Sequence, residues 1–511
     1  MQFVPLDYTP DLDTAWFVRP GAVSGMNGFA PTNKGSYATV GSGYFIGTSG
    51  SISGADVLHA QMFRQTGGTV RMLVFRKQNI DEYSSSATRT NQGSGYSAST
   101  TDWSVAAYGN AIIAVNYYDA PQVSTSTTFG NLAGSPPKAR LVAVNAEFVM
   151  LADYDDGVDV CPDGWACSGI GNYQTWAANA ATQAARNRIL SEPGPIRALV
   201  AFKEGFVFFK DNSMFQADYI GPPFVWSIKR ISNRVGCPAA HGVTELGGKL
   251  YWYHSSNFWS WDGANLVPVG DKVINTFNQY VGYFSGSLDG ALSSAYINGA
   301  SAVLSASDEG QNVVAFTATG QHDMVSRAWT FGYNTLTGKW GKWTTGSAGL
   351  SLGHSYTYRA FSFVTCTTAD AYTFASKQDA RLVALVSSDT ATSCIYLDYP
   401  GTLPTLSFDY DAVYMSLGQF GDYGSASKID NIWLRNLSGD QSGIYTVSYS
   451  SIPFEGAATP TSDGSGTYNS TLGAFDIRAH GSLHQFTINV NGSKEADLAG
   501  VAFPPHAAGK R

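Results

Sequence analysis

The sequence has few charged residues for its length. Charged side chains make up 14% of its 511 residues, whereas about a quarter is usual for a globular protein. The 31 basic and 39 acidic residues give a net charge of −8. A negative charge opposes tight binding of nucleic acid, which depends on neutralising phosphates. We therefore expect that DNA can pass this protein without being held by it.

Long hydrophobic runs and an export signal are also missing. No run approaches the 18 apolar residues that indicate a membrane-spanning helix, so we expect no membrane-spanning segment. The first residues carry Asp7, Asp11 and Asp13, where a secretory signal would have a basic end followed by an apolar block. We therefore do not expect export by the signal-peptide route.

Cysteine is scarce. The five cysteines are odd in number and scattered through the chain, a pattern that does not suit a disulfide framework. Cys161 and Cys167 are the only near pair, and no second pair completes a zinc motif. We interpret the cysteines as reduced thiols.

Short β-strands make up most of what remains. Hydrophobic residues account for 44% of the chain, which excludes a disordered protein. Segments rich in Val, Phe, Tyr and Trp alternate with turn residues at about the length of a strand. The best candidate for a helix is Thr175–Leu190, an Ala-rich stretch that runs toward Pro193. The predicted fold class is all-β.

One phrase of strands and turns recurs. An apolar strand, a two-residue turn, a second apolar strand, a polar turn and an aromatic third strand follow one another in Ala198–Tyr219, His241–Gly263 and Val303–Tyr333. Successive turns lie roughly 36 to 62 residues apart, close to the repeat length of propeller blades. Because such a meander cannot bury both faces alone, the units should stack around an axis. We predict a β-propeller-like domain over 41–404, with an ordinary β-sandwich as the alternative.

The rest of the chain surrounds this domain. The N-terminal segment, 1–40, is expected to pack onto the β core. Stretches near 84–101 and 153–195, the first rich in Ser, Thr and Gly and the second beginning with an acidic stretch, are interpreted as loop insertions. Alternating strands in 405–511 predict a C-terminal β-sandwich or barrel-like domain.

Enzyme motifs are not found. No Gly-x-Ser-x-Gly elbow precedes a helix, and no phosphate-binding Gly-rich loop is present. Ser307–Gly310 lacks the spacing of the Ser-x-Asp-x-Gly-x-x-Trp turns of sialidase blades. We predict no catalytic and no cofactor-binding residues, although two carboxylates from distant positions would leave no local signature.

Metal signals are weak. Asp153–Asp159 resembles a calcium loop in composition, but Gly164 stands where a glutamate is needed, so an acidic turn in solvent is favoured over an ion site. His480 and His484 are four residues apart, which on one strand separates them by roughly 13 Å, too far to share a metal. We predict no metal-binding residues.

Nine aromatic residues on the repeat strands could form a sugar-stacking set or pack between blades. Packing is the favoured interpretation, because all nine lie on repeat strands or at their ends. They are Trp226, Tyr251, Trp252, Tyr253, Trp259, Trp261, Trp329, Trp340 and Trp343.

Aromatic and Gly/Pro phrases follow in order through nearly the whole chain and are strongest between Pro195 and Trp343. They include Ala217–Trp226 (ADYIGPPFVW), Phe258–Gly263 (FWSWDG), Met26–Gly35, Phe129–Gly134 and Phe475–Arg478. In this order the phrases resemble the tail nozzle (tail hub) proteins of short-tailed bacteriophages.

That resemblance implies a structural virion protein and no enzyme. Six copies would form a ring below the portal and the adaptor, with the propellers outside and a central channel that conducts and gates genome ejection. The implied partners are the adaptor, tail fibre or tailspike proteins, and double-stranded DNA in passage without sequence-specific binding. The implied location is the phage tail, after assembly in the host cytoplasm. The alternative function is a receptor-binding or polysaccharide-degrading propeller.

Overall fold

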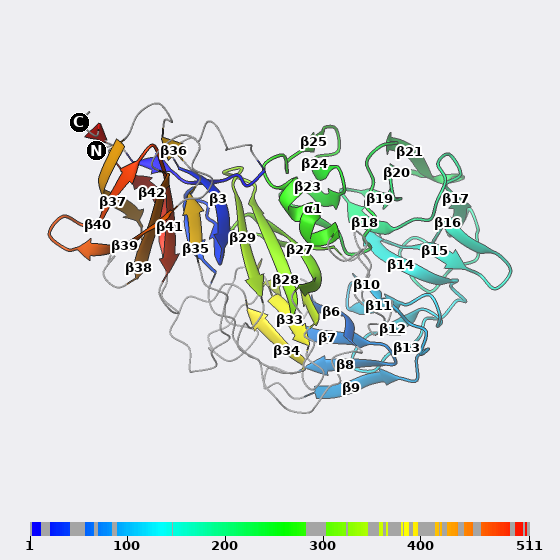
Figure 1. Ribbon diagram of the computed structural model, residues 1–511. Helices are drawn as coiled ribbons and strands as arrows, with labels where there is room; N and C mark the ends of the chain where they lie inside the picture. Colours follow the sequence, from blue (N-terminus) through cyan, green and yellow to red (C-terminus); the bar gives the residue numbers. More distant parts are fainter. Residues whose placement is uncertain are drawn as a thin grey trace, which may run out of the picture.

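The fold is seen in a computed structural model of the chain (Figure 1). The described residues are 3–11, 21–40, 57–65, 70–83, 89–145, 147–282, 303–322, 325–345, 357–360, 364–365, 380–381, 383–387, 392–396, 414–417, 420–421, 427–437, 444–452, 461–490, 496–503 and 506–507. Within them the chain forms 43 strands and one helix, so the all-β prediction is confirmed.

Four-stranded antiparallel meanders follow one another along the chain, and we call them blades 1 to 6. Blade 1 has β6 (Val57–Arg64), β7 (Val70–Arg76), β8 (Asn79–Tyr83) and β9 (Arg89–Ser94). Blade 2 has β10 (Ser104–Tyr108), β11 (Ala111–Val115), β12 (Gln122–Ser124) and β13 (Gly130–Asn131). Blade 3 has β14 (Lys138–Asn145), β15 (Phe148–Asp155), β16 (Val160–Cys167) and β17 (Ala185–Arg188).

The next three blades repeat this order. Blade 4 has β18 (Ala198–Phe202), β19 (Gly205–Phe209), β20 (Met214–Gly221) and β21 (Val225–Ser232). Blade 5 has β22 (Val243–Leu246), β23 (Lys249–His254), β24 (Asn257–Trp261) and β25 (Leu266–Pro268), and the helix α1 (Ile274–Gly282) follows it. Blade 6 has β26 (Leu304–Asp308), β27 (Val313–His322), β28 (Val325–Asn334) and β29 (Trp340–Thr345).

A seventh sheet closes the ring. It consists of β30 (Thr357–Ala360), β33 (Val383–Ser387) and β34 (Thr392–Tyr396), while β31 (Val364–Thr365) and β32 (Ala380–Arg381) pair with each other in a separate two-stranded sheet. The first strand of each blade contacts the first strand of the next, from β6 through to β30, and β31 returns to contact β6. Figure 1 shows β33 and β34 in yellow, between blade 6 and blade 1. The domain is therefore a β-propeller whose described residues form six four-stranded blades, the three-stranded sheet β30-β33-β34 and the two-stranded sheet β31-β32, with first strands lining the axis.

The turns of the meanders explain part of this regularity. Gly247 and Gly248 join β22 to β23 with φ angles of +60° and +75°. A two-residue hairpin turn of this type needs positive φ at both central residues, which glycine adopts without strain. The turn expected from the sequence at this point is confirmed.

Strands from both ends of the chain build the remaining β-structure. The N-terminal strands are β1 (Val4–Pro5), β2 (Asp7–Tyr8), β3 (Ala22–Asn27), β4 (Phe29–Pro31) and β5 (Tyr37–Thr39). The C-terminal strands are β35 (Tyr414–Leu417), β36 (Phe420–Gly421), β37 (Ser427–Asn436), β38 (Tyr445–Ile452), β39 (Thr461–Asn469), β40 (Ala474–Gly481), β41 (Leu483–Val490), β42 (Asp497–Ala502) and β43 (His506–Ala507).

These two groups are joined by pairing. β1 pairs with β42, β3 with β35, and β42 with β5, while β4 pairs with β29 of blade 6. Alternating buried residues on β41 show that one face of this structure packs on a core. The N-terminal segment thus links the C-terminal domain to the propeller (left in Figure 1).

Three stretches differ, wholly or in part, from the expectation. Thr175–Leu190 is not a helix; it consists of turns and β17, which pairs with β16. Its alanines offer few large apolar side chains to bury, so helix propensity is overridden by strand pairing. The stretches near 84–101 and 153–195 are only partly loops: residues 89–94 form β9, and 153–195 contains the end of β15, β16 and β17 with turns between them, while residues 84–88 lie outside the described part of the chain. Polar residues suit β9 and β17, because each is the outer strand of its blade and faces solvent.

Candidate functional site

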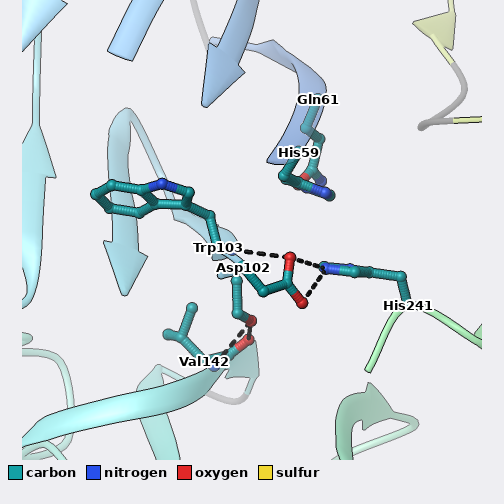
Figure 2. A network of polar contacts seen from close by, with 7 residues as sticks. His59, Gln61, Asp102, Trp103, Val142 and His241 are labelled. Atoms are coloured by element: carbon teal, nitrogen blue, oxygen red, sulfur yellow. Dashed lines mark hydrogen bonds and ion pairs between the residues drawn. The ribbon is translucent and has the colours of Figure 1, made fainter. Parts of the chain in front are cut away.

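The propeller axis carries a cluster of titratable side chains. His59 lies on β6, while Asp102 and His241 each lie two residues before the first strand of their own blade, β10 and β22. Blades 2 and 5 are not neighbours in the ring, so their side chains can meet only across the axis. We call His59, Asp102 and His241 the axial cluster (Figure 2).

Its geometry is that of an oriented histidine–carboxylate pair. His241 Nε2 lies 3.0 Å from both carboxylate oxygens of Asp102. Asp102 Oδ1 also accepts the backbone N–H of Trp103 at 2.8 Å, and the ring of His59 stacks on that of His241 with centroids 4.4 Å apart. The Asp102 side chain is 35% exposed and that of His241 23%, so the pair is within reach of solvent.

The surroundings hold this pair in place. Trp103 Nε1 donates to the carbonyl of Arg76 at 2.9 Å, and the backbone N–H of Val142 donates to Ser104 Oγ at 3.0 Å. Ser305 N–H on β26 donates to the carbonyl of His241 at 2.9 Å. Residues from blades 1, 2, 3, 5 and 6 are therefore connected around the axis.

Histidine beside a carboxylate can accept and return a proton near neutral pH. A hydrolytic site also needs a nucleophile or an activated water. The sequence did not predict the cluster, since positions 59, 102 and 241 are far apart and share no local motif.

The residues considered for metal binding are occupied in other ways. Asp153 pairs with Arg140 at 2.8 Å, and Asp156 pairs with Arg186 at 2.7 Å. Backbone N–H groups of Asp159 and Val158 lower the pKa of Asp156. The part of the chain that the structure describes contains no group of three or more His, Cys, Asp or Glu residues that could hold a metal ion.

The two histidines near the C-terminus are placed differently from the expectation. His480 lies on β40 and His484 on β41, so they belong to successive strands instead of one. The estimate of roughly 13 Å for a single strand therefore does not apply to them. His484 is buried, whereas His480 is exposed.

The described cysteines are interior groups. Cys161, Cys167 and Cys237 are free and buried. Burial raises the pKa of Cys167 to about 11 and that of Cys237 to about 12. Thiols with raised pKa values are poor nucleophiles at neutral pH.

The aromatic residues pack mainly inside the protein. Seven of the nine are at most 5% exposed, namely Trp226, Tyr251, Trp252, Tyr253, Trp261, Trp340 and Trp343. Trp252 Nε1 donates to the carbonyl of Gly236 and Trp340 Nε1 to that of Val269. For these seven the packing interpretation is confirmed; the side chain of Trp329 lies outside the described part of the structure.

Large apolar side chains are exposed on blades 3 and 4, whose strands lie at the right-hand edge of Figure 1. Ile220 and Phe224 lie together at the tip of the β20–β21 hairpin, and we call these two residues the rim patch. Val158, Val160 and Leu190 are also exposed, but they lie at the β15–β16 turn and after β17. Phe224 is 76% and Ile220 54% exposed. Exposed apolar groups of this kind mark contact surfaces when they gather on one region.

Comparison with known proteins adds little to this picture. No protein-family model and no curated protein sequence matches the chain. A chain of a mitotic checkpoint complex aligns with a TM-score of 0.39 and 9% identity, covering 73% of this chain and 93% of the other. Virginiamycin B lyase from Staphylococcus aureus aligns with a TM-score of 0.38 and 5% identity, covering 69% of this chain and 96% of the other.

YCF48 bound to D1 peptide aligns with a TM-score of 0.37 and 9% identity, covering 73% of this chain and all of the other. The described residues contain no helix long and apolar enough to cross a membrane. Since the similarities are slight, the fold assignment depends on the strand order itself, which makes this chain a β-propeller protein with an additional β-domain.

Proposed function

We propose that the chain is a structural virion protein, the tail nozzle of a short-tailed phage. Six copies would form a ring below the portal and adaptor, conduct and gate the ejected genome, and support tail fibres or spikes. This proposal starts from the ordered phrases that resemble nozzle proteins, and the propeller with an additional β-domain is consistent with it. The location would be the phage tail, with assembly in the host cytoplasm.

The observation that carries the proposal is the hairpin formed by β20 and β21. This hairpin contains Ala217–Trp226, a phrase from the region where the resemblance is strongest. Ala217 and Trp226 are buried in the blade, but Ile220 and Phe224 at the tip point into solvent. The blade does not need these two side chains for its own packing. Burial against another subunit would remove their apolar surface from water, which favours association.

The overall charge is compatible with a conduit. The net charge of −8 gives repulsion between the protein and DNA, and repulsion keeps a passing duplex from sticking. A stable ring also needs an interface of roughly 1,000 Å² or more between neighbours. The proposed interface includes the rim patch.

The first experiment measures assembly. Light scattering and electron microscopy of the purified protein should give the mass and symmetry of six chains. I220S/F224S should shift the population toward single chains, because two anchors lose their apolar surface. The matched control is L336S/L472S, which changes two exposed leucines outside the rim patch and should leave the hexamer intact.

Monomeric wild-type protein without rotational symmetry would overturn the proposal. Detection of the chain in purified virions by mass spectrometry would separate a virion protein from a scaffold of other origin. If the hexamers of I220S/F224S and L336S/L472S dissociate equally, the rim patch is not part of the interface between subunits. The wild-type mass and symmetry still decide whether the protein is a hexamer.

A second function is a receptor-binding or polysaccharide-degrading propeller. The axial cluster favours this alternative, because an oriented His241–Asp102 pair can perform proton transfer. Turnover of a host capsular polysaccharide that is lost in H241A would support this alternative. Absence of turnover together with a hexameric mass would support the nozzle.

A further inference from the structure

A cavity lies between blades 3 and 4. Its volume is about 300 Å³, which is at the lower end of the range for small-molecule sites. Trp165 of β16 lines one side together with residues 187–191, and Phe215, Trp226 and Arg230 line the other. The walls thus combine aromatic side chains with guanidinium groups.

The Trp165 indole is the most informative group in this cavity. Its side chain is 97% buried, since the residue is 3% exposed, and Nε1 has no hydrogen-bond acceptor among the described residues. By contrast, the buried indoles of Trp103 and Trp252 each donate to a backbone carbonyl. A buried donor without an acceptor is costly, and a ligand oxygen in the cavity would relieve that cost.

The charges around the cavity favour an anion. Arg188 Nε donates to Asp163 at 2.7 Å, and Arg230 Nη1 donates to Glu192. Lys210 Nζ donates to the carbonyls of Ile189 and Glu192 at 2.8 and 2.6 Å. Lys210 does not line the cavity but lies behind its Ile189 wall, and with Lys210 counted three cations stand against two carboxylates, which leaves one net positive charge. Each guanidinium also retains N–H groups beyond those used in its ion pair.

We propose that this cavity binds a carboxylate attached to an apolar body, such as a small aromatic acid or the carboxylate end of a peptide. The carboxylate would accept from the Trp165 indole and from Arg188 or Arg230, and the apolar part would lie against Phe215 and Trp226. Hydrogen bonds with an ionised acceptor are stronger than neutral ones. This binding does not depend on the proposed function, since it needs only the folded blades.

The test uses the full-length protein and the indole N–H signals of its tryptophans in NMR. The signal that disappears in W165F is assigned to Trp165. Benzoate should move this signal downfield and saturate, whereas benzamide, which has the same shape without the charge, should bind about tenfold more weakly or not at all. Acetyl-Ala-Phe with a free C-terminal carboxylate tests the peptide source, and its C-terminal amide is the matched control.

Two variants separate the hydrogen bond from the charge. W165F should weaken benzoate binding about tenfold or more, because the indole donor is lost while an aromatic ring remains. R230Q should weaken it similarly, and R234Q, an exposed arginine outside the cavity, should not. If W165F fails to fold, R230Q against R234Q still decides the question by calorimetry.

An indole signal that moves with neither acid, or equally with acid and amide, would overturn the proposal and leave the cavity to water. Tighter binding of acetyl-Ala-Phe than of benzoate assigns the site to a polypeptide carboxylate, and the reverse order assigns it to a free acid.

Discussion

Replacing Arg71 by methionine should reveal how firmly blades 1 and 2 are joined. The Arg71 side chain is 2% exposed and forms two hydrogen bonds with Glu82, from Nε at 3.0 Å and from Nη2 at 2.8 Å. Nη1 donates to Ser124 Oγ at 3.0 Å and Nη2 to the carbonyl of Thr127 at 2.9 Å. One side chain on β7 thus connects its own blade to the next one.

The expected loss follows from what R71M leaves behind. Breaking a buried ion pair by removing one partner costs about 3 to 5 kcal/mol. Glu82 is 21% exposed, so water screens part of its charge, and the lower end of that range, about 3 kcal/mol, is expected. E82L added to R71M should recover part of the loss, since no buried charge then remains without a partner.

The assay is urea unfolding at pH 7, followed by circular dichroism and compared through midpoints. The control is K229M, which breaks the Lys229–Asp218 pair, whose side chains are 56% and 41% exposed. An exposed pair of this kind should cost less than about 1 kcal/mol. If R71M shifts the urea midpoint no further than K229M does, the hydrogen bonds of Arg71 between blades 1 and 2 do not stabilise the propeller.

Two further predictions concern titratable groups. Backbone N–H groups of Asn265 and Ala264 lower the pKa of Asp262 to about 2, from an ordinary value near 3.8. Because its pKa is lowered, the contribution of Asp262 to stability is complete above pH 3.8 and is lost as the pH falls toward 2. A titration of the Asp262 carboxyl followed by NMR should have its midpoint near pH 2. A midpoint near pH 4 would contradict the role of the two backbone hydrogen bonds. Because burial raises the pKa values of Cys167 and Cys237, both thiols should stay unmodified by iodoacetamide at pH 8 in native protein and react fully in guanidinium chloride; rapid modification of the native thiols would show that they are not sealed in the interior.

The repeating strands could be predicted because the core residues and the turns of each blade lie in one continuous segment of the sequence. Two apolar strands separated by a Gly-Gly pair, such as Gly247-Gly248, form a hairpin without help from distant residues. The outer strands were missed for a physical reason. β9 is mostly polar and partly exposed, so nothing in its composition separates it from a loop. The helix α1 was missed because only nine residues form it, too few for a clear helical period.

The candidate sites were less accessible to sequence reasoning. In the axial cluster, His241 contacts Asp102, which lies 139 positions earlier in the sequence. The cavity is likewise lined by residues from two blades. Neither leaves a motif. Only the ring closure brings such residues together, and a sequence read locally does not specify which first strands face one another across the axis.

The pairing of the first strands with the last ones has a consequence for biosynthesis. β1 to β5 are synthesised before the blades, but β1 and β5 pair with β42, and β3 pairs with β35. The early strands therefore wait, with open edges, while some 370 residues between β5 and β35 are made, and non-local pairing of this kind is slow. Each of blades 1 to 5 pairs only strands that follow one another in the chain, so each can form as it emerges. The domain that contains β1 to β5 is therefore completed after these blades.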